Sequence, residues 1–125
     1  MADFMRDYIE KIKAKDWAGA AAYFADHITF HQSGTGAYSG TRSGKEEVLS
    51  WMGEITASTD SMEIEAHALT EGDGHAVAIT TFSATKGDAS FSGKRVVVYH
   101  LGDNVITELW AIDEDQAGMD AFMAL

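Results

Sequence analysis

Histidine, tyrosine and aspartate are the side chains in this sequence that could move a proton, and the histidine spacing gives a first restriction. His27 and His31 are four residues apart, which is the spacing of a metal-binding pair on a helix. The intervening residues 28–30 are β-branched or aromatic and typical of a strand, which would place the two imidazoles about 13 Å apart. We therefore predict no metal site.

His100 shares one strand face with Val96 and Val98, and it is a candidate general base if that face lines a cavity. An imidazole buried among apolar side chains has a lowered pKa and stays neutral, which suits a base near pH 7. The alternative is a core histidine that only hydrogen-bonds to one neighbour. His67, on a polar strand face, and His75, beside a turn, are expected to be solvated.

The composition excludes several classes of protein. No cysteine is present, so thiolate nucleophiles, disulfides and thiolate metal sites are excluded. No glycine-rich phosphate loop or nucleophile elbow is present either. With 20 Asp and Glu against 9 Lys and Arg, the net charge of −11 argues against nucleic acid and anionic membranes as partners. The first residues mix charged with apolar side chains, which predicts neither a signal peptide nor a membrane span, and a cytoplasmic location is the default expectation.

Helical patterns come first along the chain. Apolar residues at helical spacing between Phe4 and Ile12 predict an amphipathic helix over residues 3–14. Asp16 can cap a short second helix that carries Trp17. The segment Ser43-Gly44-Lys45-Glu46 has the spacing of a capping box and predicts the start of a third helix.

Strand patterns follow the helical ones. Residues 28–31 indicate a short strand, and from Ser61 onward apolar and polar residues alternate with a period of two. Residues 76–85, 90–101 and 105–112 are predicted to continue this pattern as an antiparallel meander. Asp113 can cap a last short helix. Helices first and hairpins later indicate an α+β fold, and 125 residues fit a single domain, 1–125.

Several segments have an order and spacing that resemble one known family. They are Asp7-Tyr8-Ile9-Glu10, Lys15-Asp16-Trp17, residues 23–31, Tyr38-Ser39-Gly40 with residues 43–46, and residues 104–113. The chain resembles the nuclear transport factor 2-like superfamily, in particular its SnoaL-like and ketosteroid isomerase-related domains, over almost its whole length. The resemblance implies a cone-shaped, curved antiparallel sheet wrapped around the N-terminal helices, with a mostly apolar internal pocket. Because such a fold carries many functions, the function must be argued from the pocket residues.

The resemblance implies roles for individual residues. Ketosteroid isomerases use an aspartate base, with a tyrosine and a protonated aspartate that donate to the developing oxyanion. Tyr8 matches that tyrosine, although it could equally be a helix-face aromatic that packs on the sheet. The base position falls at Gln32, or at His31 if the turn gap moves by one residue, and Val96 stands in place of the protonated aspartate. Since glutamine takes no proton at neutral pH, steroid isomerase chemistry is not expected unless His31 is the base.

The same resemblance implies which strand faces line the pocket. The expected substrate pocket contains Phe30, Val96, Val98, Leu109 and Ala111, with His100 on the same face as the two valines. Asp113 follows Leu109 and Ala111 on their face, either as a carboxylate at the cavity mouth that orients His100 or acts directly, or as a helix cap. SnoaL-like cyclases use an aspartate whose nearest counterpart here is Ala111, which argues against cyclase chemistry.

Two functions follow from these residues. The first is a cofactor-independent enzyme that binds a small, mainly apolar molecule and transfers protons as an isomerase, cyclase or hydratase/dehydratase. Its candidate catalytic residues are Tyr8, His31, Gln32, His100 and Asp113. The second is a non-catalytic module of the same fold that binds a ligand or mediates association. An open cavity with at least two polar groups aimed at one point would favour the enzyme.

Both faces of the last two strands are substantially apolar, although one domain has only one interior. Periodicity alone would place Trp110 in the core, whereas the resemblance places it on the outer sheet surface. We therefore predict a homodimer through that surface, with Trp110 near its centre and Ile106 and Ile112 around it.

Overall fold

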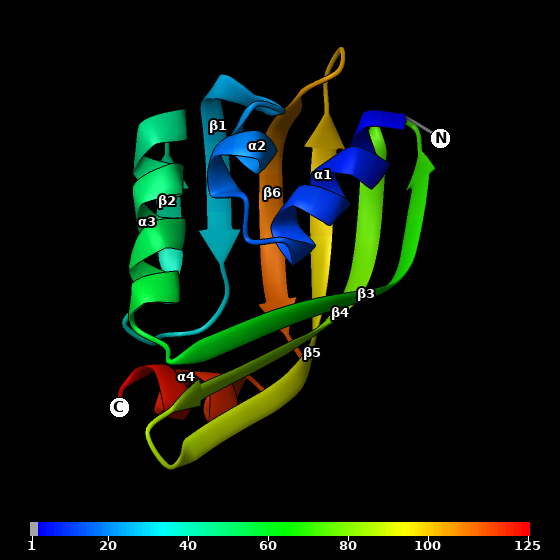
Figure 1. Cartoon of the computed structure of the whole chain (residues 1–125). Coiled ribbons are helices and arrows are strands. Elements are labelled where there is room, and N and C mark those ends of the chain that lie inside the picture. Colours follow the sequence, from blue (N-terminus) through cyan, green and yellow to red (C-terminus); the bar gives the residue numbers. More distant parts are fainter. Residues whose placement is uncertain (1–2) are drawn as a thin grey trace.

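The computed structural model describes residues 3–125 and confirms the predicted α+β architecture, a curved, unclosed sheet around N-terminal helices (Figure 1). The helices are α1 (Asp3–Lys13), α2 (Trp17–Ala21), α3 (Lys45–Ala57) and α4 (Gln116–Met123). The strands are β1 (Phe24–Gln32), β2 (Gly40–Ser43), β3 (Ser61–Gly72), β4 (His75–Lys86), β5 (Ala89–Leu101) and β6 (Ile106–Asp113). Among these described residues, no helix is long and apolar enough to cross a membrane.

The six strands form one sheet in the order β2-β1-β6-β5-β4-β3. The predicted antiparallel meander is confirmed for β3 to β6. Two features were not predicted: the short strand β2, which pairs antiparallel with β1, and the parallel pairing of β1 with β6. Figure 1 shows that the long strands β3, β4 and β5 bend sharply, so that the sheet curls around the space below α1 and beside α3.

The helices bury the apolar stripes that the sequence predicts. In α1, Met5, Tyr8 and Ile9 lie on one buried face, because residues three and four apart share a side of a helix. Asp16 caps α2 as predicted, since the backbone N–H of Gly19 donates to its Oδ1 at 2.9 Å.

The predicted capping box of α3 is wrong. Ser43 is the last residue of β2, and Gly44 occupies the N-cap position without a side-chain hydrogen bond. Gly44 has a φ of 92°, a conformation that glycine adopts without a steric penalty. Glu47, rather than Glu46, reaches back to accept from the backbone N–H of Ser43 at 3.0 Å. The chain therefore changes direction one residue later than the motif implies.

The register of β5 on β6 decides which side chains face inward. Its direct cross-strand pairs include Arg95 with Asp113, Val97 with Ala111, and Tyr99 with Leu109. Directly paired residues project from the same face of a sheet, and all of these side chains except the partly exposed Arg95 are buried.

The prediction that Val96, Val98 and His100 face the pocket is therefore wrong. These residues alternate with the buried ones and lie on the outer face, where Val96 is exposed. The predicted inward orientation of Leu109 and Ala111 is correct. At this register, the valines on β5 could not face inward together with these two residues of β6. A one-residue change of register turns every side chain of a strand to the opposite face.

Ile106 is also on the face opposite to the predicted one. It is completely buried, whereas Trp110 and Ile112 face outward. The pairing of β5 with β6 shifts between His100–Glu108 and Leu101–Ile106, which leaves Thr107 as an extra residue in β6. A β-bulge of this kind breaks the period of two, so Ile106 points inward although it is an even number of residues from Trp110.

The helix α4 covers the lower end of the sheet and is capped by Asp115, not by the predicted Asp113. The backbone N–H of Gly118 donates to Asp115 Oδ1 at 2.9 Å. Asp113 ends β6 and points into the interior. The apolar face of α4 joins a second cluster that contains Met62, Phe82, Ala84, Met119, Phe122 and Met123. This cluster forms the floor of the cone.

Candidate functional site

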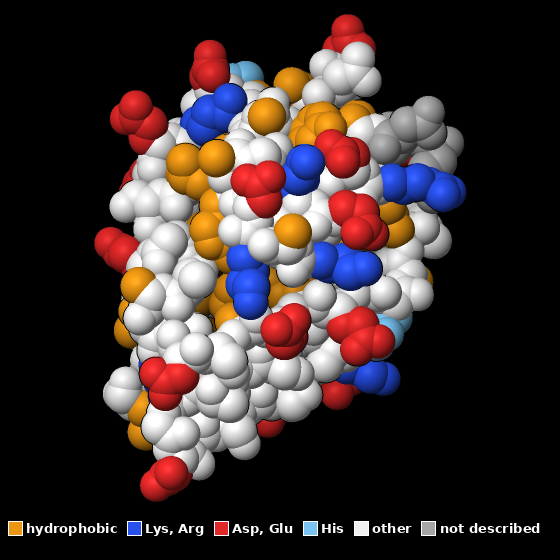
Figure 2. All heavy atoms as spheres, viewed as in Figure 1, with side chains coloured by type: hydrophobic (Ala, Val, Ile, Leu, Met, Phe, Trp, Pro, Cys, Tyr) orange, Lys and Arg blue, Asp and Glu red, His pale blue; other side chains and the backbone are white. Residues whose placement is uncertain are grey.

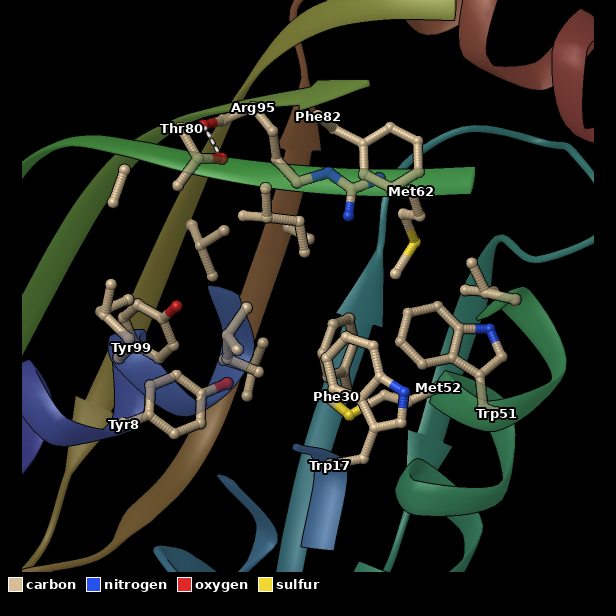
Figure 3. Close-up of a pocket in the computed structure, with 18 residues that line it drawn as sticks. Tyr8, Trp17, Phe30, Trp51, Met52, Met62, Thr80, Phe82, Arg95 and Tyr99 are labelled. Atoms are coloured by element: carbon tan, nitrogen blue, oxygen red, sulfur yellow. Dashed lines mark hydrogen bonds between the residues drawn. The ribbon is translucent and has the colours of Figure 1, made fainter. Parts of the chain in front are cut away.

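A cavity of about 90 Å³ lies between the helices and the inner face of the sheet. Its wall is mostly aromatic and aliphatic, with Trp17, Phe30, Trp51 and Phe82 as its largest apolar members. In Figure 2, apolar side chains are visible between charged ones on the helical side of the molecule. Figure 3 shows that polar groups approach this space from two sides, Tyr8 and Tyr99 from one and Arg95 from the other.

Tyr8 from α1 and Tyr99 from β5 form the first polar group. Their rings meet edge to face, with centroids 5.6 Å apart. Burial raises the pKa of Tyr8 well above its ordinary value, and the nearby Tyr99 phenol raises it further. Burial also raises the pKa of Tyr99, against smaller opposing effects of Tyr8 and Arg95. Both phenols therefore stay neutral into the alkaline range, and because they hydrogen-bond to each other, one O–H of the pair is left to donate to a ligand.

Arg95, Asp113 and Gln32 form the second polar group, deeper in the cone. Arg95 Nε donates to Asp113 Oδ1 at 2.9 Å, and its Nη2 donates to Oδ2 at 3.3 Å. Gln32 Nε2 donates to the same Oδ2 at 2.9 Å. Arg95 lines the cavity, and its guanidinium lies over the Phe82 ring at 5.1 Å. This bidentate ion pair fixes the guanidinium at the cavity wall.

The aromatic wall is held in place by its own contacts. Trp51 Nε1 donates to the backbone carbonyl of Tyr38 at 3.1 Å, and the Trp51 and Phe30 ring centroids are 4.4 Å apart. The guanidinium of Arg42 also contacts the Trp51 ring, 5.0 Å from its centroid. Since α3 supplies Trp51 and β1 supplies Phe30, the third helix and the first strand position this wall together.

The structure brings several predicted residues together at this cavity. Tyr8, Phe30, Leu109 and Ala111 line it. Gln32 and Asp113 join it through Arg95, although neither lines the larger cavity itself. Asp113 does not orient His100, because its carboxylate is bound to Arg95 and Gln32.

His31 and His100 lie on the outer face of the sheet instead. Glu108 lies between them, with its Oε2 2.6 Å from His31 Nε2 and its Oε1 3.6 Å from His100 Nδ1. The Trp110 ring stacks on His31 at 5.2 Å and meets His100 edge to face at 4.8 Å. The expectation that His100 shares the pocket with Tyr8 is therefore wrong, and Gln32, not His31, is the residue of the pair 31–32 that points inward.

Sequence reasoning missed Arg95, Tyr99 and Trp51. Arg95 and Tyr99 alternate along β5 with Val96 and Val98. Because the prediction places the two valines in the pocket, it places Arg95 and Tyr99 on the outer face. The turn at residues 102–105 held the missing signal, because its length sets the register of β5 on β6. Trp51 lies among helical residues and carried no signal beyond a buried helix face.

Comparison with known proteins gives a family for this geometry. A sequence model described as the SnoaL-like domain matches residues 5–109. No curated protein matches the sequence significantly. Among solved structures, Bal32a from a soil-derived mobile gene cassette has a TM-score of 0.91 at 15% sequence identity, covering 98% of this chain and 95% of that chain.

Two further structures are similar at comparably low identity. TerC, co-crystallised with polyporic acid, has a TM-score of 0.85 at 12% identity, covering 98% of this chain and 97% of that chain. A protein with a ketosteroid isomerase-like fold from Catenulispora acidiphila DSM 44928, in complex with trimethylamine, has a TM-score of 0.82 at 13% identity, covering 100% of this chain and 95% of that chain. These likenesses show a shared fold. Because the family model spans most of the sequence, the chain belongs to the SnoaL-like domain family, within the nuclear transport factor 2-like and ketosteroid isomerase-like folds.

Proposed function

We propose that the protein binds a small, mainly apolar molecule in the cone cavity and acts on it by proton transfer without a cofactor. The reaction would be of the isomerase, cyclase or hydratase/dehydratase type. The observation that carries this proposal is an aromatic cavity that two buried, neutral phenols and one guanidinium enter from different sides. Such a site buries an apolar body and offers donors to an oxygen on it.

Tyr8 is the proposed donor to a developing oxyanion. Its phenol stays uncharged well into the alkaline range because its pKa is raised, and it is positioned by Tyr99 and by the packing of α1. A hydrogen bond to a substrate carbonyl becomes stronger when negative charge develops on that oxygen, so it lowers the transition state more than the bound ground state. This role does not require Tyr8 to ionise.

Asp113 is the proposed proton acceptor from the predicted set, since Gln32 cannot take a proton and the two histidines lie outside. Its side chain is bound to Arg95 and Gln32 and does not line the cavity, so it would accept a proton only if Arg95 left the position in which the ion pair holds it. This commitment to Arg95 is also the observation that favours the second function, non-catalytic binding of a small ligand in the same cavity.

Exchange of α-protons on an apolar ketone tests the two functions without a known substrate. We expect the protein to speed hydrogen–deuterium exchange of 1-indanone in D₂O, followed by NMR, because enolisation is the step that Tyr8 would assist. Tyr8→Phe should lower the catalysed rate by about a hundredfold, in the range seen for lost oxyanion donors. Tyr23→Phe removes a phenol that bonds to Asp7 on the surface and should leave the rate unchanged. Binding of the ketone without accelerated exchange would favour the non-catalytic function.

The outer face of the sheet supports the proposed homodimer. Ile79, Val96 and Ile112 are exposed there on three adjacent strands, with Ile112 retaining 48% of its accessible surface. Trp110 lies between His31 and His100 at the same surface and is partly exposed. An apolar surface across three strands is the kind that a second copy covers through a twofold axis. Ile106 is buried in the core and is not part of this surface.

A further inference from the structure

The guanidinium of Arg95 carries hydrogen-bond donors that the protein does not use. Its Nε donates to Asp113 Oδ1 and its Nη2 donates to Oδ2, so the carboxylate occupies one edge of the planar group. A guanidinium has five N–H donors in a fixed fork, and three of them, two on Nη1 and one on Nη2, therefore remain free. Nη1 has no hydrogen-bond partner in the part of the chain that the structure describes.

A ligand in the larger cavity can reach these free donors. Within residues 3–125, and among side chains that are not exposed, Gln32 Oε1 is the only polar atom that is both inaccessible and unpartnered. The unpartnered Nη1 of Arg95 therefore keeps accessible surface, in a side chain that is 17% exposed. Arg95 lines the larger cavity, and Figure 3 shows its guanidinium pointing into that space from the side opposite Tyr8 and Tyr99. One cavity thus has free donors at two separated points.

The wall of this cavity offers few acceptors in return. No Asp, Glu, Asn or Gln is among the described residues that line it. The Thr80 hydroxyl lines it but already donates its proton to the backbone carbonyl of Arg95 at 3.1 Å. The indole N–H of Trp51 is also used, on the backbone carbonyl of Tyr38. The polar groups left for a ligand are therefore mainly donors, the Arg95 guanidinium and one O–H of the tyrosine pair.

The charge on Arg95 makes its free donors demanding. A ligand that fills the cavity displaces water from them, and an ionised donor left without a partner costs more than a neutral one. An apolar group at this point is therefore disfavoured. Asp113 already neutralises the guanidinium, so an uncharged acceptor is sufficient. A ligand carboxylate would place a second negative charge beside the same cation.

We infer that the ligand of the larger cavity is an uncharged, apolar ring compound with a hydrogen-bond-accepting oxygen at each end. One oxygen accepts from the tyrosine pair and the other accepts from the free N–H groups of Arg95. Arg95 and Tyr99 are four residues apart on one face of β5, so their Cα atoms are at most about 13 Å apart, which limits the body between the two oxygens to about one ring.

This pattern selects a chemical class. Diketones and keto esters carry two accepting oxygens, whereas a monoketone leaves one end of the cavity unpaired and an ammonium group has no acceptor to offer. Loss of a hydrogen bond to a buried polar group is a strong basis for discrimination between otherwise similar ligands. The inference rests on the proposed binding of a ligand in this cavity, but not on the proposed proton transfer.

Calorimetric titration with 1,4-diacetylbenzene and 4-ethylacetophenone tests the second contact. Both probes carry one acetyl group on a benzene ring, and they differ only in whether the para substituent has a carbonyl oxygen. The ratio of their dissociation constants is compared between the wild type and Arg95→Met, so the hydration of the probes cancels. We expect the preference for 1,4-diacetylbenzene to fall about tenfold in Arg95→Met, and to stay unchanged in Ile64→Val, which alters the same wall without a polar atom.

The double variant Arg95→Met/Asp113→Asn gives a second measurement, because Arg95→Met alone leaves Asp113 without its cation. It removes both charges and keeps an oxygen that can accept from Gln32 Nε2. An unchanged preference in a folded variant that lacks Arg95 would overturn the second contact while leaving the proposed ligand binding intact. Failure of both probes to bind the wild type would overturn both.

If neither variant folds, a crystal structure of the wild type with 1,4-diacetylbenzene decides the question. A carbonyl oxygen within hydrogen-bond distance of Arg95 Nη1 or Nη2 supports the inference. A bound probe with both oxygens away from the guanidinium overturns it.

Discussion

Two carboxylates on opposite faces of β6, Asp113 and Glu108, each lie between two partners, but in different surroundings. Asp113 binds Arg95 and Gln32 on the inner face, with its side chain 2% exposed. Glu108 lies between His31 and His100 on the outer face, with its side chain 33% exposed. Solvent screens the outer group, whereas the inner pair has lost its hydration and depends on its partners. On the inner face, the carboxylate and its partners therefore stabilise the fold and shape the cavity wall. On the outer face, the carboxylate interacts only weakly with its two histidine partners.

Removal of the inner partner should give the largest effect. Arg95→Met leaves Asp113 buried without its cation, which is expected to lower the free energy of unfolding by about 3–5 kcal/mol. Urea denaturation followed by circular dichroism measures this change. Arg42→Met is the matched control, because Arg42 also lies over an aromatic ring but donates to a backbone carbonyl, and it should cost much less. Similar losses of unfolding free energy in both variants would contradict the view that the buried Asp113 depends on its ion pair with Arg95.

The outer face should matter for association instead. Trp110→Ala is expected to weaken the proposed homodimer by about 2 kcal/mol or more, since tryptophan dominates the energetic centres of many interfaces. Sedimentation equilibrium at micromolar concentration measures the association constant. Trp17→Ala, which alters the cavity wall on the helical side, should leave association unchanged. A wild-type monomer at that concentration would contradict the proposed interface.

Alkaline pH should destabilise the protein through its inner face. The pKa values of Tyr8 and Tyr99 are raised in the folded state. Their contribution to the free energy of unfolding is therefore fully present below about pH 10, the ordinary tyrosine pKa. Above that pH the unfolded chain loses protons that the folded chain keeps. The free energy of unfolding should then fall by about 1.4 kcal/mol per pH unit for each of the two phenols.

Denaturant titrations between pH 9 and pH 11 measure this slope. Tyr8→Phe should remove the share of one phenol and give a shallower decline. An unchanged slope in Tyr8→Phe would show that Tyr8 can ionise without unfolding the protein.

The outer carboxylate should give the smallest effect. Glu108→Gln is expected to change the free energy of unfolding at neutral pH by less than about 1 kcal/mol, because its ion pairs are partly exposed. Thermal denaturation at two salt concentrations measures both the change and its screening. A loss as large as that of Arg95→Met would remove the contrast between the two faces.

The element order and several inward residues could be predicted from the sequence, because they depend on local patterns. Asp16 caps a helix through a contact three residues away, and the stripe that contains Tyr8 repeats within one helix. The order of segments alone was enough to give the family and its cone. The inward orientation of Leu109 and Ala111 came from the resemblance, since periodicity favoured the Trp110 face.

The remaining errors depend on non-local geometry. On β5, the side chains of Val96, Val98 and His100 alternate with those of Arg95, Val97 and Tyr99, and residue type alone does not show which set is buried. Only the pairing with β6 shows that the second set faces inward. The bulge at Thr107 shifts Ile106 to the other face, and no residue type at that point signals it. The second polar group could not be predicted, because Gln32, Arg95 and Asp113 come from three strands that meet only in the folded sheet.

The parallel contact between β1 and β6 has a consequence for how the molecule assembles. In the sheet order, β6 lies between the β2-β1 pair and the β5-β4-β3 hairpins and pairs with both. Strand β1 therefore has no partner on its β6 side until β6 is in place, during synthesis as well as refolding. Contacts between distant parts of a chain are slow to form, because the intervening loop must first be closed. We expect the cavity to be completed in the last step of folding, since Phe30 of β1 and Leu109 of β6 come together only there.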